Sequence, residues 1–274
     1  MRTEGRVVAI TGGGGGIGAA LAARFAAQDD ARVVVTDIDG ESAHAVAARI
    51  NGTSFELDVT DEQATQRVIA EIEDQFGRID ILCLNAGVAT GGSVDTPNEA
   101  WQHTWDVNVM AHVYATRHAL PGMLDRREGY IVSTASAAGL LTTIGAAPYS
   151  VTKHATVALA EWLAVTYGSR GVRVSCLCPQ FVRTPMIDAF TAMTGATADM
   201  HAWVDEIAID PAAVADAVID AIHDETFLVL PHPEVQEYFR AKAMDYDRWI
   251  AGMQRLQSTL IAGGQIGGGE VPGA

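Results

Sequence analysis

The sequence predicts a doubly wound α/β fold, in which seven parallel strands form one sheet with helices on both faces. Seven short apolar runs alternate with longer segments of helical periodicity along the 274 residues. Most of the runs are apolar throughout and rich in Val, Ile or Leu, as expected for parallel strands covered on both faces. Such alternation of strand and helix is typical of one domain built on a parallel sheet.

The predicted elements can be assigned one by one along the chain. The predicted strands span residues 6–11, 32–37, 54–57, 80–84, 130–133, 172–178 and 227–230. The predicted helices between them span residues 17–27, 41–50, 61–76, 101–126, 149–167 and 211–223. Glycines mark two helix ends, with Gly77 after one helix and Gly168 and Gly171 after another.

Two segments depart from this alternation. Residues 185–209 carry weak helical signals between a strand and a helix, and a long excursion inside a compact domain is often a lid or a binding loop. Residues 234–261 have the pattern of an amphipathic helix, and residues 263–274 form a Gly-rich tail. We therefore expect a single domain over residues 1–262, with a substrate lid and a C-terminal helical extension.

Charge and cysteine content exclude several functional classes. The chain has 34 Asp and Glu against 18 Lys and Arg, a balance that repels nucleic acid and anionic lipid, so we expect neither as a partner. No apolar run approaches the ~20 residues that span a bilayer, and a strand so close to Met1 leads us to expect no signal peptide. Cys83, Cys176 and Cys178 form no disulfide framework and fit the cytoplasm. The eight histidines lack ligand spacing, so no metal is expected.

A glycine-rich turn follows the first predicted strand and leads directly into a helix, as Thr11-Gly12-Gly13-Gly14-Gly15-Gly16-Ile17-Gly18. Glycines permit a sharp turn and let a pyrophosphate approach main-chain N–H groups at the positive end of the helix. Asp37 ends the second strand roughly twenty residues past Gly18, where a carboxylate accepts hydrogen bonds from an adenosine ribose. The carboxylate repels a 2′-phosphate, and no Arg or Lys between Asp37 and Ser42 offsets it. The sequence therefore predicts NAD as the cofactor.

Tyr149 and Lys153 stand four residues apart near the start of a predicted helix and so share one of its faces. A phenol is a poor base at neutral pH, because its usual pKa is about 10. An ammonium group nearby lowers that pKa, as does the positive ring of an oxidised nicotinamide. Ser136 lies just after a predicted strand, at the sheet edge where ligands collect, and its hydroxyl is suited to hold a substrate oxygen.

Together these features resemble the short-chain dehydrogenase/reductase family over roughly residues 5–231. The matching motifs are Thr11-Gly12-x-x-x-Gly16-Ile17-Gly18, Asp58, Asn85-Ala86-Gly87, Asn108, Ser136 and Tyr149-x-x-x-Lys153. The resemblance implies a Rossmann-type fold and an NAD(H)-dependent oxidoreductase that interconverts a secondary alcohol and a ketone. It also implies a catalytic set of Asn108, Ser136, Tyr149 and Lys153.

The resemblance assigns cofactor contacts position by position. Asp58 and Val59 are similar to the pair that contacts the adenine. Asn85-Ala86-Gly87 is similar to the turn that braces the sheet beside the cofactor. Val182 and Thr184 match the segment that receives the nicotinamide end. Tyr149 and Lys153 are expected to contact the cofactor as well.

The resemblance also implies a mechanism. Tyr149 as phenolate takes the alcohol proton while Ser136 steadies the oxygen. Lys153 lowers the tyrosine pKa and positions the ribose. Asn108 is similar to the residue that bends its helix and holds a water, which links Lys153 to solvent. Reduction of a ketone is expected to run the same steps backwards.

One position departs from the family pattern, since Pro179-Gln180 stands where the family usually has Pro-Gly. The extra side chain lies next to the segment expected to receive the nicotinamide. We interpret Gln180 as a substrate-binding residue that alters the shape or polarity of the pocket, because the catalytic set is intact.

The expected substrate is a mostly apolar alcohol or ketone, because Met186, Phe190, Met193 and Trp203 give the lid an apolar character. Two alternatives remain open, a 3-ketoacyl-thioester reductase of the same fold and a non-catalytic NAD-binding sensor. The resemblance further implies a homodimer or homotetramer through the helices predicted at 101–126 and 149–167. The substrate itself is not determined by fold and motif.

Overall fold

Seven parallel strands form one sheet in the part of the chain that the computed structural model describes, which is residues 1–28, 30–187, 202, 204 and 206–262. The strand order is β3-β2-β1-β4-β5-β6-β7, so the chain starts in the middle of the sheet and builds outward in both directions. The strands are β1 (Val7–Thr11), β2 (Arg32–Asp37), β3 (Thr53–Glu56), β4 (Ile81–Leu84), β5 (Gly129–Thr134), β6 (Val172–Leu177) and β7 (Leu228–Val229). The predicted doubly wound sheet is confirmed, and no strand end differs from its prediction by more than one residue.

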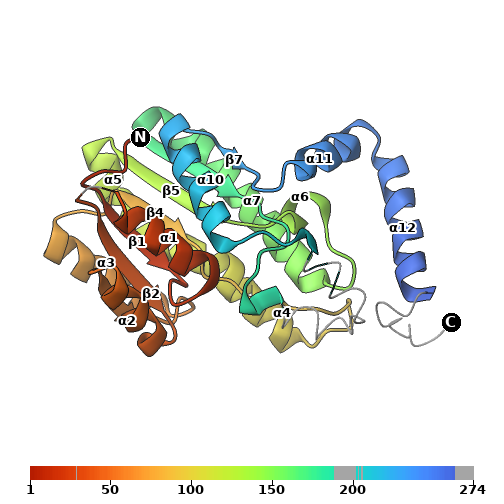
Figure 1. Cartoon of the computed structure of the whole chain (residues 1–274), viewed down its shortest axis with the longest axis horizontal. Helices are drawn as coiled ribbons and strands as arrows, with labels where there is room; N and C mark the ends of the chain where they lie inside the picture. The colour runs from red at the N-terminus through yellow and green to blue at the C-terminus, as the bar shows by residue number, and fades with distance from the viewer. Residues whose placement is uncertain (29, 188–201, 203, 205, 263–274) are drawn as a thin grey trace.

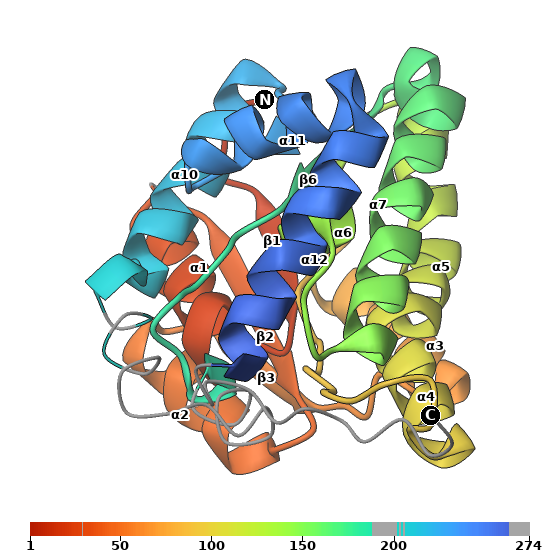
Figure 2. The same cartoon turned by 90° about the vertical axis from the view of Figure 1, so that its right-hand side faces the viewer.

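Helices cover both faces of this sheet (Figure 2). One face packs against α1 (Gly16–Ala26), α2 (Gly40–Arg49) and α10 (Pro211–Asp224). The other packs against α3 (Glu62–Phe76), α5 (Ala111–Arg126) and α7 (Ala147–Tyr167). Figure 2 shows these as two layers, with α1 and α10 on the left and α5 and α7 on the right. Because both faces are covered, the inner strands β1, β4 and β5 are buried along their whole length and carry mostly apolar side chains in both directions.

Local capping chemistry explains where several helices begin and end. Asp61 caps α3, because its carboxylate accepts a 3.0 Å hydrogen bond from the Ala64 amide. Gly77 ends the same helix in the left-handed conformation at φ +80°, which glycine adopts without strain. Pro211 occupies the first turn of α10, where its missing N–H costs no hydrogen bond.

The helix predicted at 101–126 is interrupted. It consists of α4 (Asn98–Trp105), a π-helical turn (Asp106–Met110) and then α5. A π turn holds one more residue than an α-helical turn and is frequent at functional sites. The short helix α6 (Ala138–Leu141) and the 3-10 turn Gly168–Arg170 were not predicted.

The C-terminal extension is two helices rather than one continuous helix, α11 (Glu234–Met244) and α12 (Tyr246–Ala262). Asp245 breaks the pattern with φ -152° and ψ 89°. Its carboxylate accepts a 3.0 Å hydrogen bond from the Arg248 amide, so Asp245 starts a new helix instead of continuing the old one. Figure 1 shows α12 standing apart from the sheet at one end of the molecule.

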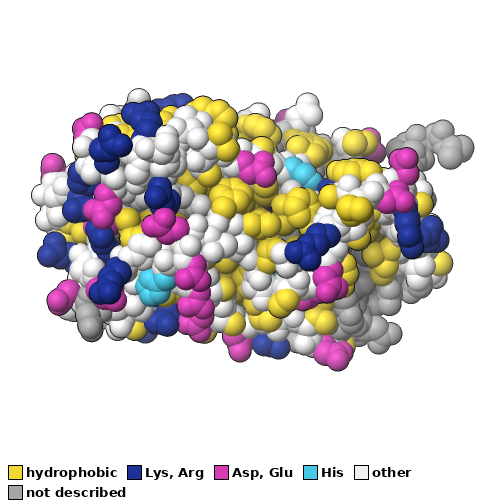
Figure 3. Space-filling model, turned by 90° about the horizontal axis from the view of Figure 1, so that it is seen from above, with side chains coloured by type: hydrophobic (Ala, Val, Ile, Leu, Met, Phe, Trp, Pro, Cys, Tyr) yellow, Lys and Arg dark blue, Asp and Glu magenta, His cyan; other side chains and the backbone are white. Residues whose placement is uncertain are grey.

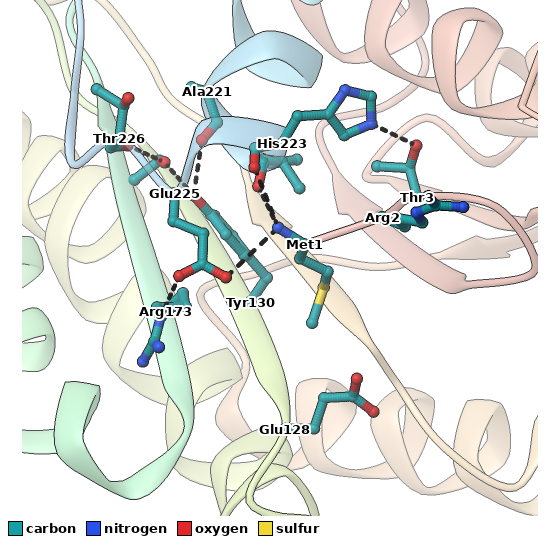
Figure 4. Close-up of polar contacts among 12 residues, drawn as sticks. Met1, Arg2, Thr3, Glu128, Tyr130, Arg173, Ala221, His223, Glu225 and Thr226 are labelled. Atoms are coloured by element: carbon teal, nitrogen blue, oxygen red, sulfur yellow. Dashed lines mark hydrogen bonds and ion pairs between the residues drawn. The ribbon is translucent and has the colours of Figure 1, made fainter.

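Polar contacts join the last strands to the end of α10 (Figure 4). The Tyr130 hydroxyl lies 2.8 Å from the Ser175 hydroxyl and donates to the Ala221 carbonyl at 3.2 Å. Arg173 donates to the Glu225 carboxylate at 2.6 Å. These contacts fix α10 against β5 and β6 and so support the short strand β7.

The surface is uneven in composition. On the face in Figure 3, charged side chains are most numerous on the left of the view and occur again at the right end, and apolar side chains lie across the middle. Within the described residues, no helix combines the length and the apolar character needed to cross a membrane. The Gly-rich tail at 263–274 and most of the lid expected at 185–209 lie outside the described residues.

Candidate active site

A cavity of about 890 Å³ opens at the carboxyl ends of the parallel strands. Segments that follow β1 through β6 all contribute to its walls, which is where ligands bind in doubly wound sheets. Most of the predicted site residues line it, namely Gly12, Gly16, Ile17, Asp37, Asp58, Val59, Asn85, Ala86, Gly87, Ser136, Tyr149, Lys153, Gln180, Val182 and Thr184. Gly18 and Asn108 are buried behind this wall.

The glycine-rich turn after β1 has no space for side chains at several positions, most clearly where main-chain atoms lie close to Gly12 and Gly18. A Cβ on Gly12 would lie 2.7 Å from the Ala86 Cα, and Gly12 has φ +62°. A Cβ on Gly18 would lie 2.1 Å from the Gly12 carbonyl oxygen. These contacts bring the start of α1 against the turn after β4 and leave main-chain atoms at the cavity wall.

The amino end of α1 fits a pyrophosphate group. Gly15 precedes the helix, no side chain caps it, and a Cβ on Gly15 would meet no atom within 4 Å. The first N–H groups of a helix lack partners within the helix and carry partial positive charge. Because Gly15 and Gly16 line the cavity, this helix end offers a ready site for the phosphates of a dinucleotide.

Asp37 stands at the end of β2 on the cavity wall. One carboxylate oxygen accepts a hydrogen bond from the Gly14 amide at 2.9 Å, and the other accepts one from Asp39 at 3.1 Å. These two amides hold the carboxylate at the mouth of the glycine-rich turn. Among the described residues that line the cavity, the basic side chains are those of Lys153 and His103.

Asp58 and Val59 lie on the wall after β3. The Asp58 carboxylate accepts hydrogen bonds from the Thr60 amide at 2.9 Å and from the Thr60 hydroxyl at 2.7 Å. Asp58 therefore shapes its own turn, and Val59 next to it supplies an apolar surface suited to a flat ring.

The Asn85-Ala86-Gly87 turn joins the ends of β4 and β1. The Asn85 side-chain amide donates to the Thr11 carbonyl at 3.2 Å and to the Gly12 carbonyl at 3.0 Å. The Thr11 hydroxyl accepts hydrogen bonds from the amides of Asn85 at 3.0 Å and Ala86 at 3.1 Å. This network holds the turn after β4 against the glycine-rich turn after β1, and so fixes the cavity wall between the two turns.

Ser136, Tyr149 and Lys153 meet at the centre of the cavity. Ser136 follows β5, and its hydroxyl oxygen accepts a hydrogen bond from the Ala138 amide at 3.1 Å. Lys153 is buried, and its ammonium group donates to the Thr134 carbonyl at 2.9 Å. The Lys153 nitrogen lies 5.8 Å from the centre of the Tyr149 ring.

Burial changes the acidity of the two titratable groups at this centre. Burial raises the pKa of Tyr149, while a hydrogen bond with Ser136 acts in the opposite direction. Burial lowers the pKa of Lys153 to about 8, and the nearby thiols of Cys178 and Cys176 oppose that change. Lys153 therefore exchanges its proton closer to neutral pH, whereas burial by itself favours the protonated form of Tyr149.

Asn108 lies in the π-helical turn and is fully buried. Its side-chain oxygen accepts a 2.9 Å hydrogen bond from the Val88 amide, and its side-chain nitrogen donates to the Val88 carbonyl at 2.9 Å. Its main-chain carbonyl accepts a hydrogen bond from the Thr156 hydroxyl at 2.8 Å. Asn108 therefore ties the turn after β4 to α7, on the side of the helix that also carries Lys153.

Gln180, Val182 and Thr184 form the wall after β6. The Gln180 amide donates to the His232 ring at 3.2 Å, and Gln180 is not in the left-handed region of backbone conformation. A side chain is therefore tolerated at this position without strain. Thr184 lies over the glycine-rich turn, since its Cγ2 would be 3.0 Å from a Cβ on Gly16.

The expected lid is described only at its ends. Met186, Ile187 and Val204 line the cavity and add to its apolar wall. Three of the apolar residues predicted to act in the lid, Phe190, Met193 and Trp203, lie outside the described residues.

Sequence reasoning missed some residues beside this site. His112 is buried on α5, with its Nδ1 3.1 Å from the Ser133 hydroxyl, and burial lowers its pKa to about 3 while the charge of Lys153 acts in the same direction. Because His112 is four residues after Asn108 in the sequence, its spacing could have indicated that it lies close to the site. Thr134 acts through its main-chain carbonyl, which residue type does not reveal. Leu141 and Ile144 also line the cavity.

The family model for short chain dehydrogenases matches residues 6–195 of this chain. This match covers the glycine-rich turn, Asn108, Ser136 and the Tyr149–Lys153 pair. The family resemblance predicted from the motifs is thereby confirmed.

Known relatives and solved structures agree with this family assignment. The chain is 37% identical over 262 residues to a 1-deoxy-11-beta-hydroxypentalenate dehydrogenase from Streptomyces exfoliatus, covering 92% of each chain. It is 38% identical over 194 residues to a meso-2,3-butanediol dehydrogenase from Serratia marcescens, covering 69% of this chain and 76% of that one. A short chain dehydrogenase/reductase from Burkholderia phymatum, solved in complex with NAD, superimposes with a TM-score of 0.80 at 28% identity, covering 90% of this chain and 96% of that one. The chain therefore belongs to the short chain dehydrogenase family and is an oxidoreductase that interconverts a secondary alcohol and a ketone.

Proposed function

We propose that this enzyme uses NAD(H), that Tyr149 is its catalytic acid and base, and that its substrate is a mostly apolar alcohol or ketone. The observation that carries the proposal is the arrangement around Tyr149. The Ser136 hydroxyl, which acts to lower the Tyr149 pKa, and the Lys153 ammonium group, 5.8 Å from the Tyr149 ring, line the same cavity as the uncapped amino end of α1.

The residues that hold the cofactor in this proposal follow the cavity wall. The amino end of α1 and the glycine-rich turn hold the pyrophosphate, Asp37 holds the adenosine ribose, and Asp58 and Val59 flank the adenine. Val182 and Thr184 receive the nicotinamide end. When bound, the cofactor supplies the hydride acceptor for oxidation and the hydride donor for reduction.

Asp37 supports NAD over NADP. Its carboxylate can accept two hydrogen bonds from a ribose diol but repels a 2′-phosphate. No Arg or Lys stands between Asp37 and Ser42, and the exposed residue after Asp37 is Ile38. An uncompensated carboxylate at this point disfavours a cofactor with an additional phosphate.

The chain's own residues then move the proton. Ser136 holds the substrate oxygen, and Tyr149 removes the proton from an alcohol or donates one to a ketone. Lys153 stabilises the phenolate by its charge, and its hydrogen bond to the Thr134 carbonyl keeps it in place. Asn108 holds the π turn beside α7, where a water passes the proton between Lys153 and solvent.

An apolar substrate is supported by the apolar side chains of the cavity wall. The lining residues include Leu141, Ile144, Phe181, Met186 and Val204. Such pockets bind apolar molecules and use few polar groups for orientation. The relatives from Streptomyces exfoliatus and Serratia marcescens are both named as dehydrogenases of hydroxylated compounds.

We further propose a cytoplasmic homo-oligomer, a dimer or a tetramer. Within the described residues, all three cysteines are free and buried, which fits a reducing compartment. On α7, Val151, Trp162 and Val165 expose large apolar side chains, 85% in the case of Val165. Contact between copies of α7 would cover them.

A cofactor-oxidation assay tests the proposal. Purified enzyme is given steroid, aryl and aliphatic secondary alcohols, and separately a 3-hydroxyacyl thioester, with NAD or NADP, and the absorbance of the reduced nicotinamide is followed. The expected result is turnover with NAD on apolar alcohols and a clear preference over NADP. Turnover confined to acyl thioesters, or NAD binding without turnover on any alcohol or ketone, would refute it.

A further inference from the structure

The last helix of the described chain, α12, lines the same cavity as Tyr149. Met253, Leu256 and Leu260 are the lining residues. They are three and four residues apart, so they share one face of the helix. Figure 2 shows α12 in front of the strands, between the α10 layer and the α7 layer.

This helix has little other packing. None of its residues is buried, although Ile250, Leu256 and Ile261 are large and apolar. Among the described helices, α12 packs mainly on α11, which in turn packs on α6. A helix with an apolar face toward a cavity, and no core of its own, is stabilised when that cavity is filled by an apolar molecule.

Lys242 fixes the junction between α11, α6 and α12. It lies in the last turn of α11 and is only 6% exposed, which is rare for a lysine. Its ammonium group donates to the Leu140 carbonyl of α6 at 2.6 Å. The same nitrogen lies 5.3 Å from the centre of the Tyr246 ring and 4.8 Å from that of Trp249, both in the first turn of α12.

The α6 end of this junction is close to the chemistry. Helix α6 begins two residues after Ser136, and its last residue, Leu141, lines the cavity. Lys242 therefore connects the segment that carries Ser136 to the helix that closes the outer end of the cavity. Lys242 has no part in the proton transfer proposed for Ser136, Tyr149 and Lys153. A buried ammonium group costs stability unless it is paired, so its place at this junction requires a structural reason.

We propose that α12 is the outer wall of the substrate site, that Met253, Leu256 and Leu260 select alcohols and ketones with a bulky, uncharged, apolar body, and that Lys242 is the residue that positions this wall. The inference rests on the proposed function. The three lining side chains carry no charge, so they offer nothing to a phosphate or carboxylate. They stabilise a bound substrate through apolar contacts with the part of the molecule that lies away from the reacting carbon. A small alcohol has no such part and cannot make these contacts.

Two substrates of different size test the wall. Isopropanol serves as the small alcohol and a decalol, a saturated two-ring secondary alcohol, as the bulky one. Met253→Ala, Leu256→Ala and Leu260→Ala should each lower the ratio of kcat/KM for decalol to that for isopropanol about tenfold. Ile250→Ala and Ile261→Ala, on the same helix but outside the cavity lining, should leave the ratio unchanged. Equal effects of lining and control variants would overturn the proposal.

Lys242→Met and Lys242→Arg test the positioning role. The methionine variant should lower the same substrate ratio, and the arginine variant should restore part of it, because guanidinium can also donate to the Leu140 carbonyl and stack on the two rings. A loss of folding alone would lower kcat/KM for decalol and for isopropanol by the same factor. That outcome would refute the positioning role. The unfolding temperature is measured for both variants to identify that case.

A binding measurement separates this inference from the proposed chemistry. Decalone, the matching ketone, is titrated into the enzyme with NADH present, and heat is measured in the Tyr149→Phe background. Weaker binding in the three lining variants, with control variants unaffected, supports the wall even if turnover is absent. Equal binding in all variants overturns the wall. Absence of turnover in the unmodified enzyme refutes only the proposed function.

Discussion

The ammonium group of Lys153 and the main-chain carbonyl of Thr134 are joined by a 2.9 Å hydrogen bond. This bond ties the catalytic face of α7 to the end of β5. Because Ser136 lies two residues further along, the same strand end positions both the group that binds the substrate oxygen and the charge that acts on Tyr149. The end of β5 therefore helps to set the position of Tyr149 relative to the substrate oxygen.

Replacing Tyr149 with Phe removes the hydroxyl and little volume. We expect kcat to fall by about 10²–10⁴-fold, the range that general acid–base catalysis contributes. NAD binding should persist, as measured by calorimetry, because most of the proposed cofactor contacts come from residues other than Tyr149. Tyr167→Phe, at the other end of α7, is the control. Substantial activity in Tyr149→Phe would rule out the assignment.

Replacing Lys153 with Met removes the positive charge near the phenol. An ammonium group favours the phenolate, so its loss should raise the pKa of Tyr149 further. The rise of kcat/KM with pH in alcohol oxidation should therefore move to higher pH in the variant. Rate profiles of both proteins between neutral and alkaline pH provide the comparison, and an unshifted profile would contradict the proposed role.

Replacing Asp37 with Asn removes the charge that disfavours a 2′-phosphate but keeps a side-chain acceptor for the Gly14 amide. The ratio of kcat/KM with NAD to that with NADP should fall about tenfold, which corresponds to about 1.4 kcal/mol. Asp39→Asn, the same change at the cap of α2, should leave the ratio near that of the unmodified enzyme. If both variants behave alike, Asp37 does not select the cofactor.

Replacing Gln180 with Gly restores the residue usual in the family. The Gln180 side chain lines the cavity while its main-chain amide bonds to His232. Substrate preference should shift severalfold, and the KM for NAD should change less. Steady-state kinetics on a panel of alcohols measures both, and an unchanged preference would count against a role in the pocket.

Buried His112 should make stability fall below neutral pH. Its pKa is lowered from 6.5 to about 3 in the folded protein, so the unfolded chain binds a proton first as the pH falls. Stability is complete above pH 6.5 and is lost from there toward pH 3. Between pH 7 and pH 5 the loss should be about 2 kcal/mol. Denaturant unfolding of the unmodified protein and of His112→Asn measures it.

The control for this experiment is His44→Asn, because His44 is exposed on α2. The unmodified protein and His44→Asn should lose the same free energy of unfolding over that pH range. His112→Asn should lose about 2 kcal/mol less. The same loss in all three proteins would show that His112 does not stay neutral.

Periodicity and turn chemistry predicted the sheet, because most strands are short, largely apolar runs bounded by polar or glycine residues. The break at Asp245 was not predicted, because the apolar spacing continues from α11 into α12 and neither Gly nor Pro marks the boundary. An aspartate that caps a helix has the same residue type as one exposed on its surface. Only the hydrogen bond to the Arg248 amide distinguishes the two.

The candidate site was predictable where side chains carry the chemistry, as in Tyr149, Lys153 and Ser136. It was not predictable where main-chain atoms or distant segments contribute. The Thr134 carbonyl would be the same with any residue at that position. Met253 and Leu260 reach the cavity from beyond the last strand, and their apolar spacing equally fits a helix packed on the core.

The π-helical turn at Asp106–Met110 makes the position of Asn108 depend on a count of residues rather than on any one side chain. One residue more than a regular turn rotates everything before it by about 100° relative to everything after it. Removing a single residue here would leave a regular helix of nearly the same composition with its two halves out of phase. Single substitutions in this turn are therefore expected to have little effect on the position of Asn108, whereas a single-residue deletion is expected to displace it.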